Sequence, residues 1–182
     1  MSRLVLGLLG VALVAVPARA TLIVGADLGE LVAGADAIVH ARVVDVRPVW
    51  VDGRRRVESI VTVLTLARLK GDAGAEISFR TPGGQIGPYR TFMVGAPSFS
   101  EGEELVLFLR LRGVPVPHVV GLSQGVFRVV ADAAGRRLVI PPALVAPDDA
   151  GRVVRGASAR RPESIERFAE RVRTLAARSA GR

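Results

Sequence analysis

The feature that most limits the possible folds is a run of short apolar segments, rich in valine and leucine, between residues 37 and 142. Gly, Pro and Asp residues separate these segments, as is typical of strands joined by turns. One short helical pattern precedes the run and another follows it. This order favours a mainly β fold, a small closed or nearly closed barrel, over a parallel sheet. We expect strands over residues 37–50, 57–71, 75–84, 89–95, 103–111, 118–132 and 137–142.

Two of these segments carry clear local signals. Asp52-Gly53 stands between the first two strands and predicts a hairpin turn with long arms. In residues 103–111 the leucines recur at every second position, and Arg110 and Arg112 fall on the opposite face. This period of two predicts a strand that is buried on one face only.

Helical patterns lie at both ends of the run. Residues 27–36 begin with an Asp cap and predict a short helix. Residues 143–161 mix Pro, Gly and Asp, which indicates a linker. Residues 162–178 then predict an amphipathic helix in which Glu163 can pair with Arg167. The apolar seam of that helix consists of Ile165, Phe168, Val172 and Leu175.

The first twenty residues predict a signal peptide. Arg3 is followed by the apolar run 4–16 and by the small-x-small sequence Ala18-Arg19-Ala20. The apolar run is shorter than the roughly 20 residues that span a bilayer, so we expect cleavage and no transmembrane segment afterwards. The expected mature chain is exported to a periplasm or outside the cell, with a β-barrel domain over 21–142. It has no Cys, which excludes disulfides and thiol catalysis.

The net charge of +8 is concentrated in the tail, because residues 151–182 hold nine arginines and only three glutamates. Such a tail predicts, as an alternative function, binding to an anionic surface such as lipid or polysaccharide. We do not expect nucleic acid as a partner, since Phe168 is the only aromatic side chain there that could stack on bases. The candidate anion-binding residues are Arg160, Arg161, Arg167 and Arg171.

Residues 121–125, Gly-Leu-Ser-Gln-Gly, match the G-x-S-x-G pattern of a hydrolase nucleophile elbow. An elbow needs a helix directly after the serine, whereas Ser123 is followed by the strand-like sequence Val-Phe-Arg-Val-Val. His40 and His118 both precede Ser123, which excludes the order Ser, acid, His. We therefore interpret the pattern as a glycine-flanked bend and expect no enzyme, with a serine hydrolase as the remote alternative.

The Gly-rich loop 80–87 is the best candidate for a ligand-facing edge. It lacks the Gly-Lys-Ser/Thr ending of a phosphate-binding loop, but loops at the rim of a barrel often carry function. The predicted ligand-binding residues are Gln85, Tyr89 and Arg90. The histidines and carboxylates show no metal-binding spacing, and we predict no metal or other cofactor.

Four motifs resemble those of netrin-like domains and of the N-terminal domains of tissue inhibitors of metalloproteinases. They are ADAIVHARVVDV (35–46), LKG (69–71), ISFRTPGG (77–84) and EGEELVLFL (101–109). The chain resembles still more closely uncharacterised exported bacterial proteins with the same Ala-Asp start, Leu-Lys-Gly close and Gly-Glu-Glu strand. The resemblance implies a five-stranded Greek-key barrel of the OB type and a habit of binding proteins. No inhibitory residue carries over, because those inhibitors act through an N-terminal Cys that this chain lacks.

These observations predict an exported, non-catalytic binding module for a protein or another envelope component. Its expected architecture is a small Greek-key, OB-like barrel with a short N-terminal helix and a C-terminal amphipathic helix.

Overall fold

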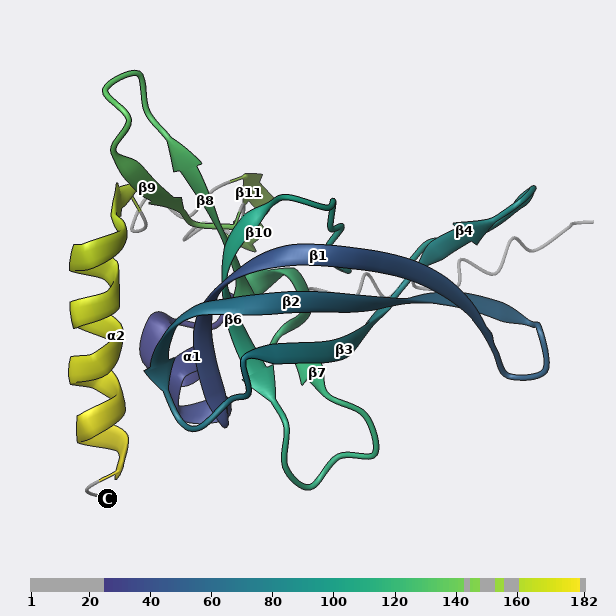
Figure 1. Cartoon of the computed structure of the whole chain (residues 1–182), viewed down its shortest axis with the longest axis horizontal. Helices are drawn as coiled ribbons and strands as arrows, with labels where there is room; N and C mark the ends of the chain where they lie inside the picture. The colour runs from purple at the N-terminus through teal and green to yellow at the C-terminus, as the bar shows by residue number, and fades with distance from the viewer. Residues whose placement is uncertain (1–24, 143–144, 148–152, 156–160, 181–182) are drawn as a thin grey trace, which may run out of the picture.

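The computed structural model describes residues 25–142, 145–147, 153–155 and 161–180. The described chain is mainly β, with a short helix near the N-terminus and a longer one at the C-terminus (Figure 1). The expected signal peptide and Arg160 lie outside the described residues. Within the described part, no helix combines the length and apolar character that crossing a bilayer requires.

One antiparallel sheet organises the molecule, with the strand order β12-β9-β8-β6-β1-β2-β3 and with β7 paired to β6. Two small strand pairs stand apart from it, β4 with β5 and β10 with β11. The sheet strands are β1 (Ala37–Val51), β2 (Arg56–Lys70), β3 (Glu76–Pro82), β6 (Glu104–Arg110), β7 (His118–Val119), β8 (Val126–Ala131), β9 (Arg137–Ile140) and β12 (Glu163–Ser164). The separate strands are β4 (Gly84–Ile86), β5 (Tyr89–Thr91), β10 (Val145–Pro147) and β11 (Val153–Arg155).

The expected hairpin between β1 and β2 is confirmed. Asp52, Gly53 and Arg54 all adopt the left-handed conformation at its turn, and the Arg56 guanidinium pairs with the Asp52 carboxylate at 2.6 Å. The two arms pair along almost their whole length. Most of this long hairpin extends well away from the helices (Figure 1).

Several expected segments are divided differently in the structure. The segment expected over 118–132 is broken into β7 and β8 by a 3-10 helix, η1 (Leu122–Gly125). Residues 75–84 do not form one strand, because the chain leaves β3 at Pro82 and starts the separate β4–β5 hairpin. In each case Gly or Pro residues end a ladder that the apolar pattern alone extends. The range expected to be a linker, 143–161, includes the β10–β11 pair.

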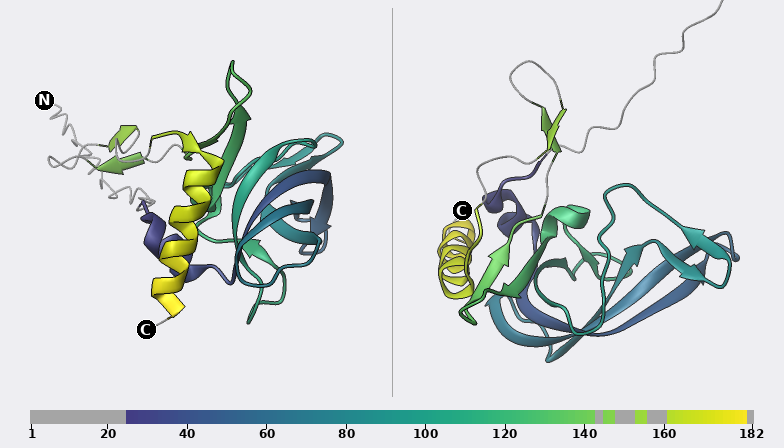
Figure 2. Two further views of the ribbon diagram at one scale, coloured as in Figure 1. Left: turned by 60° about the vertical axis from the view of Figure 1, so that its left-hand side comes forward. Right: turned by 90° about the horizontal axis from the view of Figure 1, so that it is seen from above.

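The sheet curls strongly but its ladder does not close (Figure 2). The edge strand β3 approaches β7 on the far side of the curl. One backbone hydrogen bond spans this gap, donated by the Arg80 N–H to the Pro117 carbonyl oxygen over 2.9 Å. The described strands therefore form a deeply curved open sheet.

The strand β6 is buried on both faces, so the expectation that one face is exposed was wrong. Its leucines point into the concave side of the sheet, and Val106 and Phe108 point to the convex side, where the helices pack. A central strand with a covering layer on each side has no solvated face. Arg110, which marked the polar face in the sequence, lies at the end of the strand, half exposed.

Two apolar layers stabilise the fold. We call the layer within the curl the inner core and the layer between sheet and helices the outer core. The inner core consists of Ala37, Val39, Ala41, Val43, Val61, Val63, Ala73, Ile77, Phe79, Leu105, Leu107, Leu109, Val119 and Val126. The outer core consists of Leu31, Val32, Ala35, Ile38, Leu69, Val106, Phe108, Phe127, Val129, Val139, Ile165, Phe168, Ala169 and Val172.

The C-terminal helix α2 (Ile165–Ala180) packs on the outer core of its own chain (Figure 2). Three seam residues are buried there, and the Phe168 ring lies 5.0 Å from that of Phe127. The helix starts three residues later than expected, because Glu163 and Ser164 pair with β9 and the Ser164 hydroxyl then caps the Arg167 N–H. Glu163 pairs with Arg171 instead of the expected Arg167.

The short helix α1 (Leu28–Gly34) is held by a polar junction made of Asp36, Lys70 and Gly71. The Lys70 ammonium donates to the carbonyl oxygens of Val32 and Ala35 at 2.6 and 2.7 Å, which satisfies the C-terminal end of the helix. The Asp36 carboxylate accepts from the N–H groups of Leu111 and Arg112 just after β6, both at 2.9 Å. The junction thus ties α1, β1, β2 and β6 together.

We expect Phe168→Ala to destabilise the protein by about 3–5 kcal/mol, the usual loss for truncating a fully buried Phe. Phe92→Ala, at an exposed position, should stay within about 0.5 kcal/mol of wild type. Urea denaturation of the two variants checks this. Equal stability of Phe168→Ala and the wild type would show that α2 does not contribute to the core.

Candidate functional site

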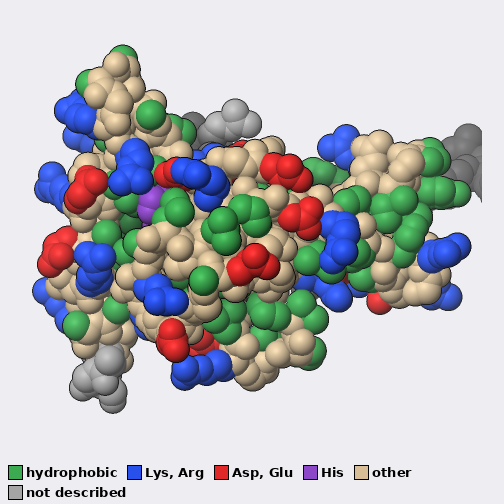
Figure 3. Space-filling view, in the orientation of Figure 1, with side chains coloured by type: hydrophobic (Ala, Val, Ile, Leu, Met, Phe, Trp, Pro, Cys, Tyr) green, Lys and Arg blue, Asp and Glu red, His purple; other side chains and the backbone are tan. Residues whose placement is uncertain are grey.

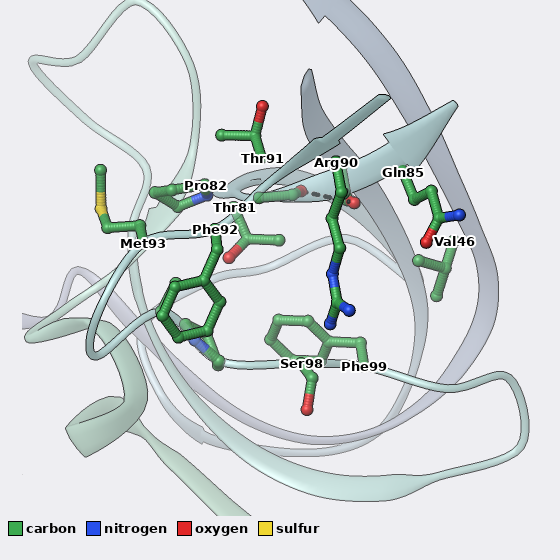
Figure 4. A pocket seen from close by; sticks show the side chains of 15 residues that line it. Val46, Thr81, Pro82, Gln85, Arg90, Thr91, Phe92, Met93, Ser98 and Phe99 are labelled. Carbon is green, nitrogen blue, oxygen red and sulfur yellow. Dashed lines mark hydrogen bonds between the residues drawn. The ribbon is translucent and has the colours of Figure 1, made fainter. Parts of the chain in front are cut away.

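A pocket of about 380 Å³ lies near the turn of the long hairpin (Figure 4). It is bounded by β1, β2, the end of β3, the β4–β5 hairpin and the loop 92–99. Its volume is within the range of about 300–1,000 Å³ that is usual for small-molecule sites. The pocket is therefore the main candidate for ligand binding in the described structure.

The β4–β5 hairpin brings together two of the three predicted ligand-binding residues. Gln85 and Arg90 are cross-strand partners, and both line the pocket. Tyr89 does not line it; its ring packs edge-on against Trp50 with 5.4 Å between the ring centroids. The hairpin is fixed to the sheet because the Val57 N–H donates to the Thr91 hydroxyl over 2.8 Å.

One wall of the pocket is apolar and continuous with the inner core. Phe92, Met93 and Phe99 come from the loop, and Val46 comes from β1. Val46 and Phe99 also pack against the inner core, where Phe99 meets Phe79 edge-on at 5.3 Å between ring centroids. This wall can contact an apolar group that enters from the open side.

Two polar side chains of the pocket have hydrogen-bonding groups that no described residue uses. The exposed Arg90 guanidinium makes no hydrogen bond or ion pair with any residue that the structure describes. Thr81 is only 4% exposed, yet its hydroxyl has no hydrogen-bond partner among the described residues. Figure 4 shows both groups directed into the pocket, the hydroxyl toward the ring of Phe92. A buried hydroxyl without a partner is costly, so this one favours a bound polar atom.

Sequence reasoning missed the apolar wall and Thr81. The triplet Phe92-Met93-Val94 lies two residues after Arg90, at the start of a loop that also contains Gly and Pro, and this position indicates exposed apolar residues. Thr81 gave no comparable signal. Its place in the site depends on the β4–β5 hairpin and the loop 92–99, which line the same pocket.

The surface around the pocket is unusually apolar for an exposed loop. Of the eight large apolar side chains exposed in the described residues, four fall in the stretch 89–94, and Phe92 and Val94 are 77% and 73% exposed. Hydrophobic side chains gather, with arginines between them, over the projecting end where Figure 1 labels β4 (Figure 3). Exposed apolar groups that cluster in this way mark interaction surfaces.

The segment Gly-Leu-Ser-Gln-Gly holds the pocket loop in place. Gly121 is left-handed, and a Cβ on Gly125 would lie 2.2 Å from the Val120 carbonyl oxygen, so the backbone requires both glycines. The Ser123 N–H donates to the Gly95 carbonyl oxygen in the pocket loop over 3.0 Å. No hydrogen bond joins the Ser123 side chain to a histidine in the part of the chain that the structure describes. The pattern thus has a structural explanation.

We expect Gly125→Ala to lower the free energy of unfolding by about 1–3 kcal/mol, because the added methyl group overlaps a backbone oxygen. Ser123→Ala should change it by less than about 0.5 kcal/mol. Thermal unfolding of both variants checks the difference. A destabilised Ser123→Ala with a normal Gly125→Ala would contradict the structural explanation.

A second polar cluster lies on the convex face, away from the pocket. His40 is buried, and its Nε2 atom lies 3.2 Å from the Glu104 carboxylate, which also binds Arg42 at 2.6 Å and Arg137 at 3.9 Å. Burial of the imidazole is the main cause that lowers the pKa of His40. Glu104 opposes this shift, and the charges of Arg137 and Arg42 add to it.

Since the folded chain favours neutral His40, the unfolded chain binds its proton more tightly. We therefore expect stability to fall as the pH drops below the unfolded pKa of 6.5, down to the lower pKa of the folded chain. Glu104 stays ionised in this window, because its own pKa is lowered, chiefly by the hydrogen bond from Arg42. His40→Gln should flatten the dependence of urea midpoint on pH, whereas His118→Gln should keep it. The same slope in His40→Gln and wild type would contradict this assignment.

The candidate anion-binding residues are brought together only in part. Arg161, Arg167 and Arg171 line an open hollow beside α2, and Glu163 lies in the same hollow. The Arg171 guanidinium is paired with Glu163 and also lies over the Phe168 ring, 5.6 Å from its centroid. The hollow is therefore less cationic than the sequence of the tail predicts.

No group of three or more His, Asp or Glu side chains that could hold a metal occurs in the described ranges. No protein-family model, curated protein or solved structure matches the chain.

Proposed function

We propose that the protein is an exported, non-catalytic binding module for a protein or another envelope component. Its binding surface is the projecting end made of the β4–β5 hairpin and the loop 92–99. The proposal joins the signal-like N-terminal sequence with the pocket and with the apolar loop beside it.

The observation that carries this proposal is the exposure of Phe92, Met93 and Val94. Exposing large apolar side chains gives up the free energy of their burial, about 25 cal/mol for each Å² left in water. The loop is nevertheless anchored on both sides. Before the triplet, the Thr91 hydroxyl accepts from the Val57 N–H; after it, Gly95 accepts from Ser123, and the Arg128 guanidinium donates to the Ser98 carbonyl oxygen over 2.9 Å. A loop fixed in this way presents the three side chains on a prepared surface, which lowers the entropic cost of binding.

The non-catalytic role is supported by the positions of the polar groups that a hydrolase would use. Ser123 lies in a 3-10 turn whose flanking glycines are required by the backbone. His40 faces Glu104 on the convex side of the sheet. The pocket itself offers a cation, a hydroxyl and an amide, which suit recognition.

For the fold, we propose an open barrel of the OB type with Greek-key connections. The sheet order places β6, β1, β2 and β3 side by side, and β7, paired to β6, lies near β3. The backbone hydrogen bond from Arg80, in β3, to Pro117, just before β7, supports this proposed barrel because it joins the two sides of the curl. The resemblance to netrin-like domains, which also implies such a barrel, stays a prediction.

The test is capture of a partner by the tagged full chain from envelope and extracellular fractions of a bacterium that exports it. We expect the double variant Phe92→Ser/Val94→Ser to lose at least tenfold of the captured partner, because truncated apolar anchors cost about 2 kcal/mol or more. The matched control is Leu64→Ser/Leu66→Ser, which removes two exposed apolar side chains elsewhere. Equal losses in the two double variants, with both still folded, would refute the proposed surface.

The alternative is binding to an anionic surface through α2. The open hollow at Arg161 and Arg167 favours it, and the pairing of Arg171 with Glu163 weakens it. Because α2 belongs to the outer core, the suitable variant changes charge only, Arg161→Gln/Arg167→Gln. Salt-sensitive binding to anionic lipid vesicles that this variant abolishes would support the alternative.

A further inference from the structure

The geometry of the pocket points to a specific ligand class: we propose that it binds a carboxylate attached to an apolar group. The carboxylate lies at Arg90 and Thr81, and the apolar group lies along Phe92, Met93 and Phe99. This inference rests on the proposed function, because it names what the projecting end recognises. A free fatty acid and the C-terminal carboxylate of a peptide with an apolar last residue share this chemistry.

Arg90 supplies the charge for the head group. It belongs to the same hairpin as Gln85, whose amide already donates to the Gly87 carbonyl oxygen over 3.1 Å. The guanidinium has no such partner among the described residues and is directed into the pocket (Figure 4). Among the described residues, no carboxylate lines the pocket. An arginine placed in this way attracts an anion and can bind a carboxylate through two parallel hydrogen bonds.

Thr81 supplies a second polar contact inside the pocket. Its backbone is fixed by the pairing of β3 with β2, where Thr81 faces Ser59. The neighbouring hydroxyl of Ser59 is already used, since it donates to the Gly83 carbonyl oxygen over 2.9 Å. The Thr81 hydroxyl has no partner among the described residues, but it is covered on the side of the exposed Phe92 ring (Figure 4). A carboxylate oxygen reaches it when that ring turns aside, and then accepts its proton in a hydrogen bond.

The apolar wall determines the rest of the ligand. Val46 and Phe99 rest on the inner core, so they form a fixed floor for an apolar chain or side chain. Phe92 and Met93 lie at the exposed side of the same pocket. An apolar group between them covers surface that is otherwise exposed to water, which favours binding by the hydrophobic effect.

A phosphate group fits this pocket less well than a carboxylate does. Sites for phosphate usually combine several cationic groups with backbone N–H groups at a helix N-terminus. Here Arg90 is the one cationic side chain among the described residues that line the pocket, and strands and a loop form the described walls. One guanidinium and one hydroxyl match the single charge of a carboxylate.

The experiment is titration calorimetry of the full chain with two acids and their neutral counterparts. The probes are octanoate against 1-octanol, and acetyl-Gly-Gly-Leu against its C-terminal amide. We expect at least one acid to bind, and its neutral counterpart to bind at least tenfold more weakly. Binding of octanoate alone indicates a lipid-like source, and binding of the peptide acid alone indicates a protein C-terminus; either supports the proposal.

Three variants locate the bound group. Arg90→Gln should weaken binding of the acid at least tenfold, whereas Arg47→Gln, at an exposed arginine outside the pocket, should not change it. Thr81→Val should weaken binding while the thermal midpoint of the free protein stays the same or rises, since a buried unpaired hydroxyl is removed.

The proposal is overturned if neither acid binds, if acid and neutral probes bind alike, or if Arg90→Gln binds like wild type. These failures are distinct from failure of the proposed function. A partner whose capture depends on Phe92 and Val94, with no binding of either acid, leaves the binding module and removes only the carboxylate ligand. If an acid binds but no partner is captured, the carboxylate site stands and the proposed binding of a protein or envelope component fails.

Discussion

The fold depends on the partly buried ammonium group of Lys70, the only lysine in the chain. Its hydrogen bonds to two carbonyl oxygens at the end of α1 fix that helix to the end of β2. Burial lowers the pKa of Lys70, and the nearby Asp36 carboxylate counteracts this. Backbone N–H groups of Arg112 and Leu111 in turn lower the pKa of Asp36 and hold it ionised. A Cβ on Gly71 would lie 2.1 Å from the Asp36 carbonyl oxygen, so the chain needs glycine there.

The junction also explains why the two ends of the sheet differ, one covered by helices and the other carrying the pocket. At the junction, α1 and α2 cover the convex face, and β6 becomes a fully buried strand between the inner and outer cores. Toward the turn of the long hairpin, β1 and β2 continue without helices over them. The inner core ends there at Val46 and Phe99, which are only partly buried. The pocket forms where the inner core ends and the β4–β5 hairpin closes over it.

Much of this architecture could be predicted from local patterns. The Asp52-Gly53 turn, the Asp27 cap and the apolar seam of α2 each specify an element through contacts within a few residues. The errors concern long-range pairing. The alternation in residues 103–111 does not reveal that helices cover the second face, because Val106 and Phe108 gain their neighbours from distant parts of the chain. Likewise, Gln85 and Arg90 could be chosen from a rim loop, whereas Thr81 and Phe99 could not.

The sequence by itself determined the class of elements, their order, the basic tail and the absence of disulfides, since these follow from residue type and local periodicity. Only the tertiary structure decided which face of each strand is buried, where α2 packs and which side chains surround the pocket. The reason is the separation along the chain: Val46, Thr81 and Phe99 meet only after the sheet curls and the loop is anchored. The lack of a partner for the Thr81 hydroxyl, on which the proposed ligand chemistry depends, is a property of that assembled environment.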